Sequence, residues 1–70
     1  MKIRKVTFNN RRRVFEVLTH RGTYCFPYAK AEVKPSPTDR IEELYIDKEL
    51  GREAFTYVLE SGVEGTVHID

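Results

Sequence analysis

The chain has 70 residues, a formal net charge of +1 and a single cysteine. This length fits one small domain, whose folding buries only about 60% of the surface that the unfolded chain exposes. A single cysteine excludes an intramolecular disulfide and any zinc site that uses several cysteines. No segment approaches the roughly 20 apolar residues of a membrane helix, and no apolar stretch of a signal peptide follows the first five residues. We therefore expect a cytoplasmic protein with no membrane partner.

Residues 1–33 are expected to form a basic meander of three antiparallel strands. Residues 2–9 and 12–19 are rich in β-branched and aromatic residues, and Asn9-Asn10 between them tolerates the left-handed backbone of tight turns. Gly22 marks the second turn, because glycine adopts positive φ freely.

The third strand is predicted over residues 23–28. Alternation places Tyr24, Phe26 and Tyr28 on one face and Cys25 with Pro27 on the other. Pro27 has no backbone N–H, so this strand lies at a sheet edge or ends there. Flanked by aromatic residues in a regular strand, Cys25 is interpreted as a small buried hydrophobe rather than a nucleophile.

The connector at residues 34–40 separates two halves of opposite charge. It contains Pro35 and Pro37, which favour extended backbone. Residues 1–40 hold ten Lys or Arg against three acids, a net charge of +7, whereas residues 41–70 hold two against eight, a net charge of −6. Either the two halves pair their charges on packing, or the first presents a basic face to a partner.

Residues 41–70 are expected to form an acidic meander. Short β-rich runs at 43–46, 54–59 and 63–69 predict its strands, and Asp47 and Gly51 bracket a short helical turn near 47–51. The apolar spacing over residues 50–60 also fits a helix, which would make the class α+β. Gly51 and the β-formers of 55–58 favour the strand. We predict an all-β domain of five to six strands in two meanders.

No residues show the pattern of a catalytic or metal site. His20 and His68 are 48 positions apart and share no motif with Cys25, and the four glycines are isolated, so they form no phosphate-binding loop. We therefore predict a protein that is not an enzyme and needs no cofactor.

Nucleic-acid binding is the alternative that the basic residues suggest. The predicted first hairpin carries clustered positive charge that could contact phosphates. These residues are Lys2, Arg4, Lys5, Arg11, Arg12 and Arg13. The row Tyr24, Phe26 and Tyr28 could stack bases, form an interface or belong to the core.

Four segments resemble an uncharacterised family of small bacterial proteins. They are residues 6–10 (VTFNN), 22–30 (GTYCFPYAK), 49–59 (ELGREAFTYVL) and 65–70 (GTVHID). In that family a β-rich segment lies upstream of a C-terminal helix-turn-helix region. The resemblance implies an N-terminal domain of a bacterial DNA-binding regulator, with native residues following Asp70 and DNA contacted mainly by that later part. This domain would then supply self-association, ligand sensing or recognition of a protein partner.

Overall fold

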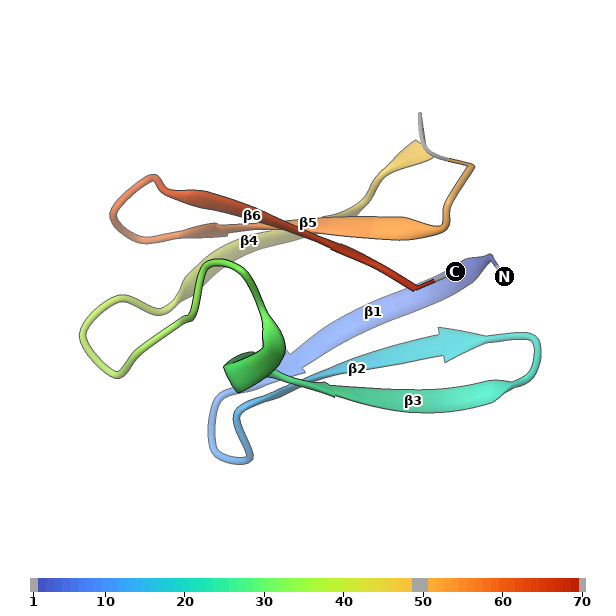
Figure 1. Cartoon of the computed structure of the whole chain (residues 1–70), viewed down its shortest axis with the longest axis horizontal. Coiled ribbons are helices and arrows are strands. Elements are labelled where there is room, and N and C mark those ends of the chain that lie inside the picture. Colours follow the sequence, from blue (N-terminus) through green and yellow to red (C-terminus); the bar gives the residue numbers. More distant parts are fainter. Residues whose placement is uncertain (1, 49–50, 70) are drawn as a thin grey trace.

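The computed structural model describes residues 2–48 and 51–69, which form two three-stranded antiparallel sheets (Figure 1). The first sheet has the order β1-β2-β3 and the second β4-β5-β6, so each strand pairs only with its neighbours along the chain. The strands are β1 (Ile3–Asn9), β2 (Val14–Thr19), β3 (Gly22–Pro27), β4 (Ile41–Ile46), β5 (Ala54–Leu59) and β6 (Glu64–His68). The prediction of an all-β domain in two meanders is confirmed.

The inner face of the first sheet follows from the alternation of β2. Phe15 and Val17 are buried, and they lie opposite Phe26 and Tyr24 of β3. The prediction that Tyr24 and Phe26 share a face is therefore confirmed. The other face carries Cys25, which is exposed. The interpretation of Cys25 as buried is wrong because its side of the sheet faces away from the second sheet.

The second sheet presents β5 as its buried central strand. Phe55, Tyr57 and Leu59 are all buried on one face, as the alternation predicts. The strand interpretation of residues 54–59 is confirmed over the helical alternative, because ladder pairs join β5 to both neighbours. The helical turn predicted near 47–51 includes residues 49 and 50, which lie outside the described residues.

The two sheets pack face to face around Phe15. Its ring centroid lies 4.9 Å from those of both Phe55 and Tyr57 and 4.8 Å from that of Tyr28. The ring planes are tilted by 42–58° to one another, and aromatic rings at this separation attract each other beyond the burial of their area. One residue of the basic half thus joins the aromatic side chains of both halves.

Tyr28 does not continue the third strand. β3 ends at Pro27, as the missing N–H predicts, and Tyr28 begins the 3-10 helix η1 (Tyr28–Lys30). Within the described residues no helix is long and apolar enough to cross a membrane.

Candidate functional site

The β1–β2 hairpin holds its arginines on a turn that is closed by side-chain hydrogen bonds. The side chain of Asn9 accepts hydrogen bonds from the amides of Arg11 and Arg12, both at 3.1 Å. Such an Asx turn satisfies backbone donors that would otherwise need water. The left-handed residue of this turn is Arg13, with φ of 57°, rather than either asparagine.

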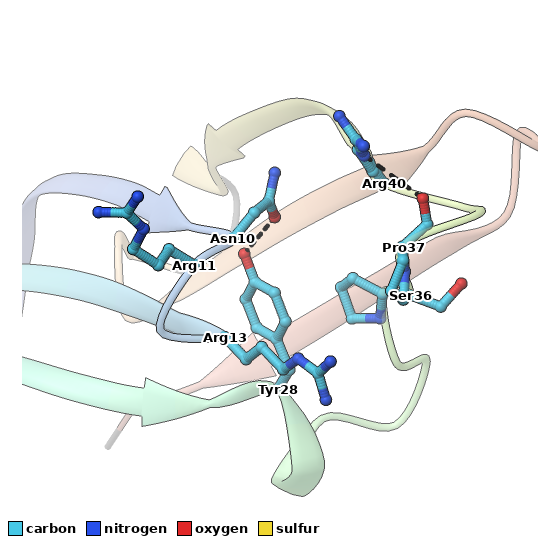
Figure 2. A pocket seen from close by; sticks show the side chains of 8 residues that line it. Asn10, Arg11, Arg13, Tyr28, Ser36, Pro37 and Arg40 are labelled. Atoms are coloured by element: carbon cyan, nitrogen blue, oxygen red, sulfur yellow. Dashed lines mark hydrogen bonds between the residues drawn. The ribbon is translucent and has the colours of Figure 1, made fainter.

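A cleft with a volume of about 810 Å³ opens between this hairpin and the connector (Figure 2). We call it the arginine cleft. Its lining residues are Asn10, Arg11, Arg13, Tyr28, Pro35, Ser36, Pro37 and Arg40. In Figure 2 the guanidinium of Arg13 extends between Tyr28 and Ser36, Arg40 lies on the opposite side above Pro37, and Arg11 points away.

Tyr28 fixes one wall of the arginine cleft. Its hydroxyl donates to Oδ1 of Asn10 at 2.8 Å, and its amide donates to the carbonyl of Arg13 at 2.9 Å. Burial raises the pKa of the Tyr28 phenol, so the neutral hydroxyl persists as a donor at physiological pH. The hairpin and η1 are therefore joined at two points.

The opposite wall is attached to the second sheet. The Arg40 amide donates to Glu60 Oε1 at 2.9 Å, and the Glu60 amide donates to the Arg40 carbonyl at 2.9 Å. Asp39 accepts bonds from the amide and hydroxyl of Ser61 at 3.0 and 2.7 Å. These bonds position Arg40 from the acidic half, although no motif in the sequence linked it to the hairpin.

The six predicted basic residues do not form one compact surface. Lys2, Arg4 and Lys5 lie at the start of β1, whereas the three hairpin arginines follow its end. Four strand residues, 6–9, lie between Lys5 and the hairpin loop, and they span about 13 Å. All six side chains are exposed, and none forms an ion pair with another described residue. Only Arg11 and Arg13 reach the arginine cleft.

The predicted aromatic row is divided between core and surface. Tyr28 is buried, Phe26 is half-buried, and Tyr24 is 47% exposed. Exposure of the row increases from Tyr28 toward the β2–β3 turn. Tyr24 is therefore the member of the row that a partner can contact most.

The free edge of β3 follows from its pairing with β2. Hydrogen-bonded and non-hydrogen-bonded pairs alternate in an antiparallel ladder. The bond from the Tyr28 amide to Arg13 makes Phe26–Phe15 and Tyr24–Val17 the hydrogen-bonded pairs. The amides and carbonyls of Thr23 and Cys25 therefore point away from β2, and β3 is the edge of its sheet (Figure 1).

β3 is also the uncharged edge of the fold. Edge strands usually carry charged side chains that prevent pairing with another chain. The other three edge strands do so, with Arg4 and Lys5 on β1, Glu42 and Glu43 on β4, and Glu64 on β6. β3 has the sequence GTYCFP and only Pro27, at its end, as a blocking residue.

The residues considered for catalysis do not gather into a centre. Among residues 2–48 and 51–69, no group of three or more His, Cys, Asp or Glu side chains could hold a metal ion. His20 and His68 are both exposed. Of the features described above, the β3 edge and the arginine cleft are therefore the two that we consider as binding surfaces.

In comparisons with known proteins, no family model, curated protein or solved structure matches this chain.

Proposed function

We propose that this chain is a non-enzymatic assembly domain that pairs with a second copy of itself through β3. The observation that carries the proposal is the uncharged free edge of that strand. In the bacterial DNA-binding regulator that the family resemblance implies, such pairing would bring two DNA-binding regions together. The proposal places the protein in the cytoplasm.

The free backbone groups favour one register of β3 pairing. With Tyr24 opposite its copy, each Thr23 faces the partner's Cys25, and every outward amide and carbonyl of these residues is used. Pro27 then lies opposite Arg21 in the turn, where its missing N–H costs no ladder bond. With Cys25 opposite its copy, Thr23 would instead meet Pro27, which donates no hydrogen bond.

Sedimentation equilibrium tests the assembly directly. We expect a reversible dimer whose dissociation constant rises about tenfold or more in Tyr24→Lys, because like charges lie opposite each other and a ring pair is lost. Tyr45→Lys is the matched control, since Tyr45 is also 47% exposed on an edge strand, β4. A chain that stays monomeric at millimolar concentration, or equal effects of the two variants, would refute β3 pairing.

Disulfide trapping tests the register. Residues opposite each other in a non-hydrogen-bonded pair have Cα atoms about 4.5 Å apart, within disulfide range. The Y24C/C25S variant should therefore oxidise to a covalent dimer, whereas Cys25 of the unmodified chain lies diagonal to its copy and should not. If the unmodified chain formed the covalent dimer and Y24C/C25S did not, the Tyr24-centred register would be wrong.

The second candidate function is direct nucleic-acid binding through Lys2, Arg4, Lys5, Arg11, Arg12 and Arg13. Its supporting observation is that all six are exposed and none is ion-paired with a described residue. Affinity for a duplex or single strand should fall steeply with salt. Amide-shift titrations with nucleic acid at low and moderate salt would reveal this loss of affinity. If the amide shifts of these residues did not change, the candidate would be excluded.

A further inference from the structure

The arginine cleft gathers positive charge that is not neutralised by the part of the chain that the structure describes. Arg11, Arg13 and Arg40 line it, the described lining residues include no acidic one, and none of the three arginines forms an ion pair with a described residue. The nearby carboxylates of Asp39 and Glu60 accept hydrogen bonds from the backbone or hydroxyl groups of Ser61 and Arg40. A cavity lined by charges of one sign concentrates counter-ions, so its ligand is expected to be anionic.

Arg13 occupies a backbone conformation that its residue type disfavours. Its φ of 57° lies in the left-handed region, where a side chain with a Cβ costs roughly 1 kcal/mol or more. Glycine would fit this position without that cost. The Arg13 carbonyl accepts a bond from the Tyr28 amide, which fixes the backbone from which the Arg13 side chain extends along the cleft wall.

The side chains and the volume of the cleft indicate which class of anion it could bind. Guanidinium groups bind phosphate oxygens through paired N–H donors. Arg13 lines the cleft from the hairpin and Arg40 lines it from the connector, where Arg40 Nε also donates to the Pro37 carbonyl at 3.4 Å (Figure 2). The volume of about 810 Å³ is that of a site for a small organic molecule rather than a bare ion. Pro35, Pro37 and Tyr28 supply apolar wall for an uncharged part.

We propose that the arginine cleft binds a small phosphorylated organic molecule, with the phosphate held between Arg13 and Arg40. Arg11 strengthens the positive potential without direct contact, because its side chain points away. The site is separate from the β3 edge, so Tyr24→Lys leaves it intact.

Amide-shift NMR titration of the 70-residue chain tests the ligand class. The probes are a nucleoside monophosphate, the same nucleoside without phosphate, inorganic phosphate, and an oligonucleotide without terminal phosphate. With the monophosphate we expect saturable shifts at Asn10, Arg13, Tyr28 and Arg40. Inorganic phosphate should bind at least about tenfold more weakly, and the nucleoside should not bind. Affinity should rise between pH 5 and 7 as the phosphate gains its second charge. The proposal would be overturned if the oligonucleotide were the one probe that bound, or if the nucleoside bound as tightly as the monophosphate.

A pair of arginine-to-glycine variants separates binding from folding. Arg13→Gly removes the guanidinium and the backbone strain together, so the variant should be at least as stable as the parent chain yet bind the monophosphate at least about tenfold more weakly. Arg52→Gly is the matched control, because Arg52 also has positive φ, at 62°, but does not line the cleft. It should keep full affinity. Equal affinities of the two variants would overturn the assignment of Arg13 as a ligand-binding residue.

Discussion

Gly65→Ala should destabilise the domain by contact with one aromatic ring. Gly65 lies opposite Tyr57 on the neighbouring strand, and the Tyr57 ring covers it. A Cβ at position 65 would overlap the ring, including a carbon only 2.9 Å away, whereas ordinary contacts begin near 3.4 Å. The ring would have to move by about half an ångström or more to relieve contacts of this kind.

The magnitude of the Gly65→Ala effect follows from what the ring loses. Tyr57 is fully buried, packs on Phe15, and donates its hydroxyl to the carbonyl of Val33, which directly precedes the connector. Overpacking costs about 1–3 kcal/mol and a lost hydrogen bond about 1 kcal/mol, against a gain of up to about 1 kcal/mol from a stiffer unfolded chain. The net loss should be about 2 kcal/mol.

Urea unfolding monitored by circular dichroism measures this loss as a lower midpoint at an unchanged slope. Gly62→Ala provides the contrast, because Gly62 has φ of 92° with nothing near its Cβ position, so its cost is purely conformational. Tyr57→Leu should remove most of the Gly65→Ala penalty in a double-mutant cycle, since leucine lacks the ring atoms that collide. Additive effects in that cycle, or a Gly65→Ala midpoint equal to that of the parent, would refute the argument.

Two further outcomes concern pH and the hairpin. Burial raises the pKa of the Tyr28 and Tyr57 phenols, so the folded state holds these protons longer than the unfolded state does. The two neutral phenols contribute their full stability below pH 10, and this contribution is lost as the pH rises through their pKa values in the folded state. Between pH 8 and 11 the urea midpoint should therefore fall less in Tyr57→Phe than in the parent chain. Asn9→Ala removes the acceptor for two hairpin amides and should cost about 1 kcal/mol, measured by thermal unfolding, whereas an unchanged melting temperature would show that water replaces the Asx turn.

The strands could be predicted because their signals are local. Alternating apolar residues identify both faces of β5, and the missing N–H of Pro27 marks the end of β3. The burial of Cys25 could not be predicted correctly, because alternation separates two faces without telling which one meets the second sheet. That depends on how the halves dock.

The arginine cleft could be only partly predicted for a similar reason. Arg11 and Arg13 stand out as a cluster in the sequence, but Arg40 reaches them only through the path of the connector. That path depends on the bonds from Arg40 to Glu60 and from Ser61 to Asp39, whose partners are 20 and 22 positions apart. The spacing of these residues in the sequence does not indicate that Arg40 lies near Arg11 and Arg13 in the fold.

Pairing only between sequence neighbours has a consequence for how the chain reaches this fold. Each hairpin closes a short loop, so the entropy lost in forming either sheet is small. The contacts of Phe15 with Phe55 and Tyr57 instead span about 40 residues, and they can form only when the two meanders collapse together. Opposite net charges of +7 and −6 on the two halves accelerate that encounter. The rate-limiting step of folding is thus expected to be the docking of two preformed, mutually attracting meanders.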